Sequence, residues 1–354
     1  MPSKTVLLGV TGSIAAYKAA QLCSNLCKKG YEVHVIMTRN ACELVAPQTF
    51  QTLSGNRVSV ETFDRGFEWN VEHVALAKRA GAFLVAPATA NFIAKMAHGI
   101  ADDMLTTTLL AARCPVVVCP AMNTAMFDHP ATQENMEILR RRGVLFVDAE
   151  SGRLACGDNG RGRFAAYSRI EEAVEAALET EKPLAGKRVL VTAGATQEAL
   201  DPVRYITNHS TGRMGYAVAR AARRLGAGVV LAAAPGALPD PWGVRVRHTV
   251  SAREMFDAVR EELPEADYVV MAAAVADYRP AEVAAQKIKK ADGALSLSLE
   301  RTDDILLWLG QNRREGQKIC GFSMETENLI ENSREKLRKK NCDLLVANSL
   351  STPG

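Results

Sequence analysis

The sequence predicts an α/β protein made of two tandem doubly wound, mostly parallel-sheet domains. Its 354 residues exceed one typical domain of about 150 residues. Short apolar runs alternate with helical patterns in both halves, which is typical of βαβ units. A segment that contains Pro183 and Gly186 interrupts this alternation near the middle of the chain, so we expect one domain on each side of it.

The first half begins with a strand, a helix and a second strand. Residues 5–9 are an apolar run, residues 14–29 have helical periodicity, and residues 31–37 are a second strand. Three such elements within about 30 residues predict a parallel sheet. Further strands are predicted at residues 82–85, 115–119 and 144–147.

The second half repeats this plan after a helix over residues 171–181. Proline cannot continue that helix, so the domains are predicted to span residues 1–183 and 184–354. A helix is predicted at residues 212–225. Only a few residues follow the last strand, so we expect an incomplete C-terminus. The strands of this half are predicted at residues 187–192, 229–233, 267–272, 318–322 and 343–347.

Composition excludes several classes of protein. Hydrophobic residues make up 47% of the chain, which is too many for a disordered protein. No apolar run approaches the roughly 18 to 20 residues that cross a bilayer, and no targeting segment is present, so we expect a cytoplasmic protein without membrane contact. The 43 basic and 40 acidic residues are well mixed, which argues against a nucleic-acid partner. Eight scattered cysteines without a CxxC pair exclude a disulfide scaffold.

Small polar turns follow four strands of the first half. Ligands of open α/β sheets bind outside the carboxyl ends of the strands. The first turn is neither a GxGxxG nor a Walker A loop, so it indicates a mononucleotide phosphate rather than a dinucleotide. Simple helix capping by the threonine or serine of this first turn is the alternative. The turn residues are Gly12, Ser13, Thr38, Thr89, Asn91 and Asn123.

Two other side chains of the first half are candidates for chemistry. His73 lies near the start of a helix, where a structural role is also open. Cys156 lies in a glycine-rich segment, residues 151–160, which has no periodicity and is predicted to be a loop. A cysteine there could close over a site as an acid or a nucleophile.

In the second half, residues 201–215 are dense in polar groups directly before a helix. Ser210 and Thr211 can cap this helix, but capping does not explain the crowding of Arg204, Asn208 and Arg213, so the segment is a candidate phosphate cradle. Further along, an acid follows a strand, as suits a nucleotide or Mg²⁺. Several lysines are found there too, and taken alone they favour a solvated surface. These residues are Asp277, Lys287, Lys336 and Lys340.

Several motifs together resemble known families. Thr-Gly-Ser-Ile-Ala-Ala-Tyr-Lys at residues 11–18, Pro-Ala-Thr-Ala-Asn at 87–91, Pro-Ala-Met-Asn at 120–123 and Leu-Ala-Cys-Gly-Asp at 154–158 resemble flavin-dependent cysteine decarboxylases. The second half resembles phosphopantothenate–cysteine ligases. Their fusion resembles the bifunctional coenzyme A biosynthesis family over essentially the whole chain. The resemblance implies a flavodoxin-like or Rossmann-like flavoprotein domain followed by a Rossmann-like ligase domain.

For the first half, the resemblance implies decarboxylation of phosphopantothenoylcysteine to 4'-phosphopantetheine with FMN. It makes His73 the base, Asn123 the residue that binds the substrate carboxylate and Cys156 the proton donor. Oxidation of the thiol to a thioaldehyde by FMN provides an electron sink for the loss of carbon dioxide. It further implies a homo-oligomer with a trimeric flavin half. The residues implied for FMN are Gly12, Ser13, Thr38, Thr89 and Asn91.

For the second half, the resemblance implies that CTP activates 4'-phosphopantothenate as an acyl-cytidylate, which L-cysteine then attacks. Asn208 and Lys287 would be catalytic, and Mg²⁺ would accompany the triphosphate, with Asp277 as its ligand. The chain departs from the family at Arg213, where the family has lysine, and at Thr302-Asp303, where it has Asn-Pro. The residues implied for CTP are Ala273, Asp277, Lys287, Asp303, Asp304, Ile305, Phe322, Lys336 and Lys340.

Two other functions share the features of the flavin half. A peptidyl-cysteine decarboxylase would have the same first domain, but the ligase-like second half argues against it. A non-catalytic regulatory flavoprotein is another alternative, and the presence of both His73 and Cys156 argues against it.

Overall fold

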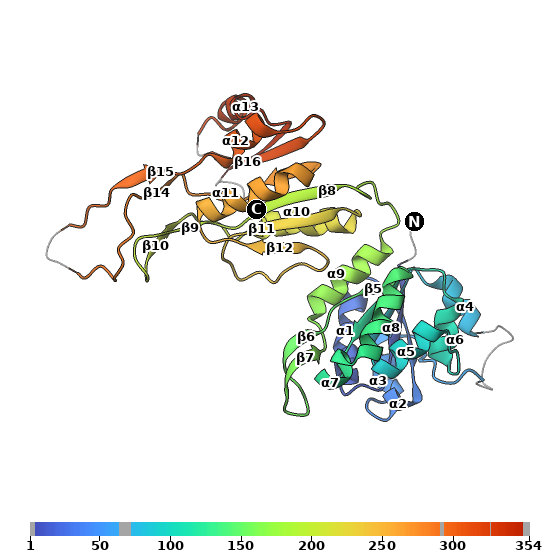
Figure 1. Cartoon of the computed structure of the whole chain (residues 1–354). Coiled ribbons are helices and arrows are strands. Elements are labelled where there is room, and N and C mark those ends of the chain that lie inside the picture. Colours follow the sequence, from blue (N-terminus) through green and yellow to red (C-terminus); the bar gives the residue numbers. More distant parts are fainter. Residues whose placement is uncertain (1–3, 64–71, 291–293, 326, 350–354) are drawn as a thin grey trace. The chain divides into compact units, whose positions relative to one another are not determined.

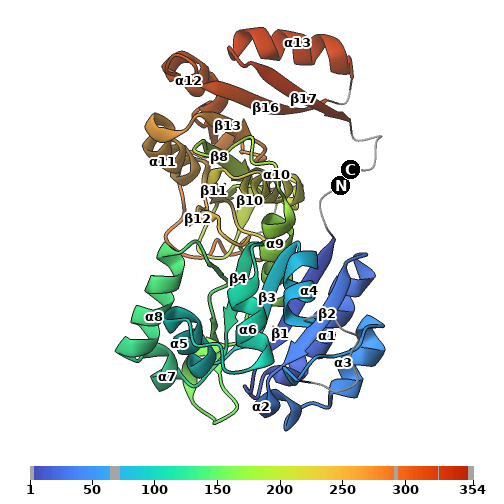
Figure 2. The same ribbon diagram turned by 90° about the vertical axis from the view of Figure 1, so that its right-hand side faces the viewer.

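The computed structural model describes residues 4–63, 72–290, 294–325 and 327–349. The chain forms two compact units, Met1–Thr180 and Glu181–Gly354, and each is built on a parallel sheet flanked by helices (Figures 1 and 2). The predicted α/β class with two tandem doubly wound domains is therefore confirmed. The terminal residues 350–354, on which the expectation of an incomplete C-terminus rests, lie outside the described residues.

The first unit contains a five-stranded parallel sheet. Its strands lie in the order β2 (Glu32–Met37), β1 (Thr5–Val10), β3 (Ala82–Ala88), β4 (Val116–Pro120) and β5 (Leu145–Phe146). The central strands β1 and β3 are buried along their whole length, because helices cover both faces of the sheet. The helices are α1 (Ala16–Lys28), α2 (Arg39–Cys42), α3 (Pro47–Ser54), α4 (Glu72–Arg79), α5 (Ala90–His98), α6 (Met104–Ala111), α7 (Thr124–Asp128), α8 (Pro130–Arg141) and α9 (Tyr167–Leu178).

The order of these strands decides where a site can form. Consecutive strands are parallel, so the turns that follow β1, β2, β3 and β4 all lie at one edge of the sheet. Two of those turns contact each other directly. The Thr11 hydroxyl donates to the carbonyl oxygen of Pro87 at 2.8 Å and accepts from the backbone N–H of Thr89 at 3.0 Å. The turn after β1 is thereby fixed against the turn after β3.

The second unit contains a six-stranded parallel sheet in the order β12 (Arg245–His248), β11 (Gly228–Ala233), β8 (Arg188–Ala193), β13 (Tyr268–Met271), β16 (Lys318–Glu325) and β17 (Leu344–Ser349). Two antiparallel pairs extend from it, β9 (Gln197–Ala199) with β10 (Tyr205–Thr207), and β14 (Tyr278–Pro280) with β15 (Leu299–Arg301). The helices are α10 (Arg213–Arg224), α11 (Ala252–Glu262), the 3₁₀ turn η1 (Leu263–Glu265), α12 (Ile305–Asn312) and α13 (Leu329–Lys339).

One predicted loop is wrong. The segment around Cys156 forms an antiparallel hairpin of β6 (Glu150–Arg153) and β7 (Asn159–Arg163). A backbone ladder needs no alternation of apolar side chains, so the glycine-rich sequence concealed it. Gly162 has φ +121°, and a Cβ there would overlap the carbonyl oxygen of Met122. Glycine therefore allows the hairpin to lie against the turn after β4.

In the part of the chain that the structure describes, no helix is both long enough and apolar enough to cross a bilayer. The eight cysteines are all free thiols, and Cys23 is packed in the core of the first unit.

Candidate active sites

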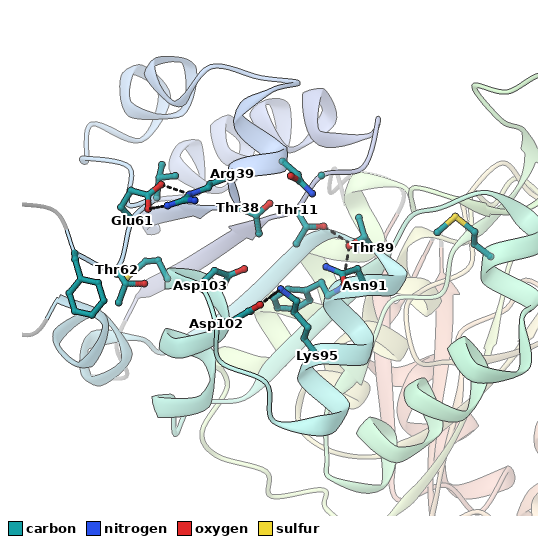
Figure 3. A pocket seen from close by; sticks show the side chains of 17 residues that line it. Thr11, Thr38, Arg39, Glu61, Thr62, Thr89, Asn91, Lys95, Asp102 and Asp103 are labelled. Carbon is teal, nitrogen blue, oxygen red and sulfur yellow. Dashed lines mark hydrogen bonds and ion pairs between the residues drawn. The ribbon is translucent and has the colours of Figure 1, made fainter.

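A cavity of about 780 Å³ opens at the edge of the first sheet (Figure 3). Two of its lining threonines are helix N-caps. The Thr38 hydroxyl accepts from the N–H of Ala41 at 3.3 Å, and that of Thr89 accepts from the N–H of Phe92 at 3.2 Å. Helix N-termini present unpaired N–H groups that attract anions. Of the residues expected to bind FMN, Gly12, Thr38, Thr89 and Asn91 line this cavity.

Five charged residues of this cavity were missed by the sequence analysis, namely Arg39, Glu61, Lys95, Asp102 and Asp103. Arg39 forms an ion pair with Glu61 at 2.6 Å, and Lys95 forms one with Asp102 at 2.7 Å (Figure 3). Each pair joins a residue on a helix to a residue on a connecting segment. Only the position of Arg39, directly after the predicted turn residue Thr38, offered a signal in the sequence.

A second cavity of about 900 Å³ lies beside the first and shares Gly12, Thr89 and Met126 with it. Ser13 lines this second cavity rather than the first. Asn123 and Cys156 line it as well, so the structure brings these two expected catalytic residues together. Three cations were not predicted there, namely Lys18, Arg153 and Arg163.

Asn123 and Cys156 belong to a small polar cluster. The Asn123 side chain caps α7 through its Oδ1, which accepts from the N–H of Ala125 at 2.8 Å. Its Nδ2 donates to Cys156 Sγ at 3.5 Å and to Asp158 Oδ2 at 3.3 Å, and Cys156 Sγ donates to the same carboxylate oxygen at 3.3 Å. Asp158 was not predicted as a site residue, although it lies in the same sequence motif as Cys156.

The hairpin itself holds this cluster in place. The N–H of Met122 donates to the carbonyl oxygen of Gly162 at 3.0 Å, and the Thr124 hydroxyl donates to the carbonyl oxygen of Arg161 at 2.8 Å. These bonds flank Asn123 on both sides along the chain. The thiol of Cys156 is exposed near the tip of the hairpin, where it can meet a ligand in the cavity.

His73 is not brought to either cavity. It lies half-buried in the first turn of α4, and it is absent from the described residues that line the two cavities. The neighbouring Glu72 accepts a hydrogen bond from the Ser59 hydroxyl, which ties the start of this helix to the segment after α3. The role of His73 as a base therefore stays a prediction.

The second unit has a cavity of about 580 Å³ beside β13, β16 and the helices α12 and α13. It is also lined by Arg301 and Lys339, which were not predicted. The residues that line it come from segments up to 69 positions apart in the sequence, from Met271 to Lys340. Eight of the nine residues expected to bind CTP line this one cavity: Ala273, Asp277, Asp303, Asp304, Ile305, Phe322, Lys336 and Lys340.

Asp304 and Lys340 form an ion pair inside this cavity. Asp304 is also the N-cap of α12, since its Oδ1 accepts from the N–H of Leu307 at 2.9 Å. Burial lowers the pKa of Lys340 although the Asp277 carboxylate opposes the shift. The extra acid Asp303, at a departure from the family pattern, is paired with Arg253 at 3.4 Å.

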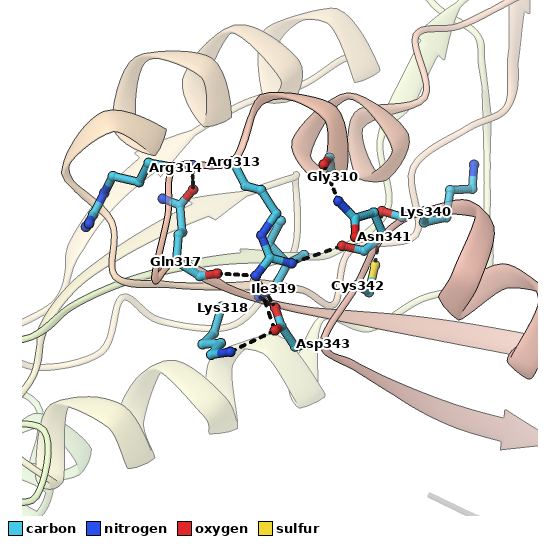
Figure 4. A network of polar contacts seen from close by, with 10 residues as sticks. All are labelled: Gly310, Arg313, Arg314, Gln317, Lys318, Ile319, Lys340, Asn341, Cys342 and Asp343. Carbon is cyan, nitrogen blue, oxygen red and sulfur yellow. Dashed lines mark hydrogen bonds and ion pairs between the residues drawn. The ribbon is translucent and has the colours of Figure 1, made fainter.

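A polar network behind the cavity fixes the backbone at Lys340 (Figure 4). Asn341 has φ +51°, and its Nδ2 donates to the carbonyl oxygen of Gly310 at 2.8 Å. A Cβ at Gly310 would overlap the carbonyl oxygen of Lys340. Arg313 donates to the carbonyl oxygen of Asn341 at 3.1 Å and forms an ion pair with Asp343 at 2.9 Å. The turn after α13 is thus packed directly on α12.

The two residues expected to be catalytic in this unit lie outside the described lining of the cavity. Asn208 is exposed, and its Nδ2 donates to the carbonyl oxygens of Ala274 at 3.3 Å and Val275 at 3.2 Å. Val275 does line the cavity, so Asn208 lies near its rim. Lys287 is exposed on the segment that follows β14.

The expected phosphate cradle precedes α10. Gly212 is the N-cap of this helix with φ +74°, and the Ser210 hydroxyl accepts from its N–H at 3.3 Å. A Cβ at Gly215 would lie 2.5 Å from that of Ala193, so glycine lets α10 pack closely on β8. The N-cap position is therefore Gly212 rather than Ser210 or Thr211, although the Thr211 hydroxyl accepts from the N–H of Arg213 at 3.5 Å. Arg213 is exposed at the first position of the helix.

No group of three or more histidine, cysteine or acidic side chains within the described ranges is arranged to hold a metal ion. Asp277 is the one residue that the sequence analysis expects to bind Mg²⁺, and it lines the cavity of the second unit.

Comparisons with known proteins match both halves. A family model described as Flavoprotein matches residues 1–179, and one described as DNA/pantothenate metabolism flavoprotein C-terminal domain matches residues 184–354. The Coenzyme A biosynthesis bifunctional protein CoaBC of Bacillus subtilis (strain 168) is 47% identical over 355 residues, covering 99% of this chain and 87% of the relative. That of Vibrio vulnificus (strain YJ016) is 44% identical over 356 residues, covering 100% and 88%.

Among solved structures, the crystal structure of the C-terminal domain of a Coenzyme A biosynthesis bifunctional protein CoaBC is 44% identical. The match covers 48% of this chain and 80% of that chain, with a TM-score of 0.43.

Proposed function

The chain belongs to the family of coenzyme A biosynthesis bifunctional proteins. From this premise we propose which of the two reactions each site catalyses. The protein is an enzyme of coenzyme A biosynthesis with a decarboxylase and a ligase activity. The ligase joins 4'-phosphopantothenate to L-cysteine at the expense of CTP, and the decarboxylase converts the product to 4'-phosphopantetheine. We assign the decarboxylase to residues 1–183 and the ligase to residues 184–354.

One observation carries this proposal. The residues expected for the two reactions separate into cavities of different units, with Asn123 and Cys156 in the first unit and eight nucleotide-site residues in the second. Since these residues are dispersed along the sequence, their assembly into two sites supports two reactions.

The first unit fits FMN at the cavity that contains Thr38 and Thr89. Its volume of about 780 Å³ is within the usual range for a ligand pocket, and two capped helices offer N–H groups to a phosphate. A Cβ at Gly12 would lie 2.5 Å from that of Asn40, so only glycine fits this turn. When bound, FMN would supply the oxidation of the carbon that carries the cysteinyl thiol, and later the reduction of the same carbon.

The residues of the adjoining cavity perform the polar steps. Asn123 Nδ2 is a donor for the carboxylate that leaves as carbon dioxide, and Cys156 carries the proton that the product needs at carbon. The Asp158 carboxylate accepts hydrogen bonds from Asn123 Nδ2 and from Cys156 Sγ, which keeps the side chains of Asn123 and Cys156 oriented toward each other. A substrate carboxylate would take the place of Asp158 on Asn123.

In the second unit, the Asp304–Lys340 pair marks the nucleotide site. Lys336 and Lys340 line the cavity, where their positive charges can offset the negative charge that develops on the phosphates. Lys287, which is not among the residues that line this cavity, would contribute a further positive charge. Asn208 would stabilise the acyl intermediate at the rim. Mg²⁺ would enter with the triphosphate, with Asp277 as the protein ligand.

Two further assignments are part of the proposal. We propose that the flavin half forms a trimer, and the position of His73 outside the cavities of its own chain supports an assembly of more than one copy. A neighbouring copy could then supply His73 to a complete site. The protein acts in the cytoplasm, where CTP and thiol substrates are available.

The test is an assay with the purified, flavin-loaded chain. CTP, Mg²⁺, L-cysteine and 4'-phosphopantothenate should together yield pyrophosphate, carbon dioxide and 4'-phosphopantetheine. Omission of CTP should abolish all three, and addition of phosphopantothenoylcysteine should then restore carbon dioxide and 4'-phosphopantetheine but not pyrophosphate. Carbon dioxide release only from a peptide with a C-terminal cysteine would overturn the proposal in favour of a peptidyl-cysteine decarboxylase. No release from either substrate would indicate a non-catalytic flavoprotein.

A further inference from the structure

The buried carboxylate of Asp201 lies at the tip of the β9–β10 hairpin. The turn is closed by the N–H of Leu200, which donates to the carbonyl oxygen of Arg204 at 2.8 Å. The Asp201 side chain is shielded from solvent, whereas residues 202–205, which follow it, are exposed. Burial of a charged carboxylate is unfavourable unless it is paired and hydrogen-bonded, so its partners indicate what it holds together.

Those partners come from two distant parts of the chain. Asp201 Oδ1 accepts from the N–H groups of Val203 at 2.8 Å and Arg204 at 2.9 Å. Oδ2 accepts from Arg204 Nε at 2.9 Å and Nη2 at 2.5 Å, and from the N–H of Ile288 at 3.1 Å. Arg204 Nη2 also donates to the carbonyl oxygen of Ile288 at 2.6 Å. Both backbone groups of Ile288 are therefore bound by one ion pair.

The segment that contains Ile288 has little other structure to hold it. Between β14 and β15, the described residues 281–290 and 294–298 form neither helix nor strand. The N–H of Ala281 donates to the carbonyl oxygen of Ser298 at the base of this excursion, and that of Ala284 donates to the carbonyl oxygen of Leu200, each at 3.0 Å. Since ordering costs about 1–2 kcal/mol per residue, an exposed segment of this kind needs specific anchors.

The anchored residue stands between two lysines, Lys287 and Lys289. The β9–β10 hairpin that binds it also leads directly into Asn208. Figure 1 shows both hairpins extending from the same end of the second unit. The contacts of Asp201 thus connect the hairpin that leads into Asn208 to the segment that contains Lys287.

We propose that Asp201, through Arg204 and the backbone of Ile288, is a positioning residue that presents Lys287 to the phosphates of the nucleotide in the ligase reaction. This inference rests on the proposed function of Lys287. Burial alone would raise the pKa of Asp201, but Arg204 and three backbone N–H groups hold it well below its usual range, so the anchor is charged at neutral pH. Asp201 itself touches no reacting atom.

The test compares Asp201→Asn, Lys287→Gln and the double variant in pyrophosphate release by the flavin-loaded chain. Both carboxylate oxygens of Asp201 accept from N–H donors. Asparagine replaces one of these oxygens by an NH₂ group, which is itself a donor, so the variant cannot keep all five hydrogen bonds. Loss of one electrostatic contact to developing charge costs about 10²-fold in rate. We expect both single variants to slow kcat by about that factor, and the double variant to be no slower than the slower single variant.

A second readout does not depend on activity. Trypsin cleaves after Lys287, Lys289 and Lys290, and anchoring of Ile288 should protect these bonds. Asp201→Asn should increase the cleavage rate there at least about tenfold, because protection follows the free energy of local opening. Asp240→Asn, which removes an exposed carboxylate that lies 3.3 Å from His248, is the matched control and should leave both readouts unchanged. An unchanged thermal midpoint of the second unit would show that the variant folds, and retained decarboxylation would show that the first unit is unaffected.

The outcomes separate the inference from the function on which it rests. Multiplicative loss in the double variant, or unchanged trypsin protection in Asp201→Asn, would overturn the positioning role. If Lys287→Gln released pyrophosphate at the parental rate while Asp201→Asn lost protection, the anchor would stand and the catalytic assignment of Lys287 would be wrong.

Discussion

Asn123 Nδ2 and Cys156 Sγ lie 3.5 Å apart although 33 residues separate them in the sequence. The contact joins the N-cap of α7, at the end of a buried strand, to the tip of an exposed hairpin. A substrate carboxylate on Asn123 would therefore lie next to the thiol. This proximity suits a reaction in which loss of carbon dioxide is followed by protonation at a nearby carbon.

Cys156→Ser should separate these two steps. Serine is close to cysteine in size but is a far weaker acid, so carbon dioxide release should persist while formation of 4'-phosphopantetheine falls at least about 10²-fold. Anaerobic rapid-scan spectra should show loss of the oxidised flavin absorbance without recovery, and the enethiol should accumulate. Should the flavin absorbance never fall, Cys156 would act before oxidation of the substrate, and its role as proton donor would be wrong.

Mixed oligomers test the position of His73. His73→Asn and Cys156→Ser chains should each be inactive in forming 4'-phosphopantetheine. If a site combines His73 of one copy with Cys156 of another, co-expression of the two chains should restore about a quarter of the parental activity, since one interface in four joins two intact residues. Two differently tagged chains, purified together, provide the measurement. Activity that stays at the level of the single variants would place both residues in the same chain's site.

Much of the first site could be predicted from the sequence, because it depends on the order of the chain. Thr38 and Thr89 follow apolar strands, and a parallel sheet brings such turns to one edge. The strand–helix pattern fixes this edge without any knowledge of side-chain contacts.

The remaining features depend on pairs that are distant in the sequence. The β6–β7 hairpin has no apolar alternation, and its close approach to the turn after β4 depends on glycine at position 162. Asp201 and Ile288 are 87 residues apart, and no local pattern indicates that they are bonded. His73 was assigned by resemblance alone, and the fold of one chain does not bring it to the cavities.

Asn341→Ala should weaken nucleotide binding without touching the cavity. The variant removes the hydrogen bond from Asn341 Nδ2 to the carbonyl oxygen of Gly310. Alanine also tolerates φ +51° less well than asparagine. The backbone at Lys340 is therefore no longer held against α12. Loss of about 1 kcal/mol of such positioning corresponds to a KM for CTP that is about fivefold higher. The rate of decarboxylation should not change, because that reaction belongs to the other unit.

Asn312→Ala is the control for this change. Its Nδ2 donates to the carbonyl oxygen of Trp308 on the same helix at 2.8 Å, away from Lys340. A similar rise in the KM for CTP in both variants would attribute the effect to general weakening of α12. Gly310→Ala should act more strongly than Asn341→Ala, since its Cβ would overlap the carbonyl oxygen of Lys340.

Asp343 should make the second unit sensitive to acid. Burial of its carboxyl would raise its pKa, but hydrogen bonds from the N–H of Ile319 and from Arg313 and Lys318 lower the pKa to about 2 (Figure 4). Because the folded value lies below the unfolded value of about 4, the carboxylate stabilises the unit above about pH 4, and this stabilisation is lost as the pH falls toward 2. Its contribution to the free energy of unfolding at pH 7 is at most about 3 kcal/mol.

Asp343→Asn should therefore lower the free energy of unfolding of the second unit at pH 7 and flatten its dependence on pH between about 4 and 2. Denaturant titration followed by tryptophan fluorescence measures this in a Trp69→Phe background, since Trp242 and Trp308 both lie in the second unit. Glu300→Gln, which removes an exposed ion pair with Arg279, should change stability by less than about 1 kcal/mol. An equal loss for Asp343→Asn at pH 7 and at pH 2 would show that packing, rather than the charge of Asp343, stabilises the turn behind Lys340.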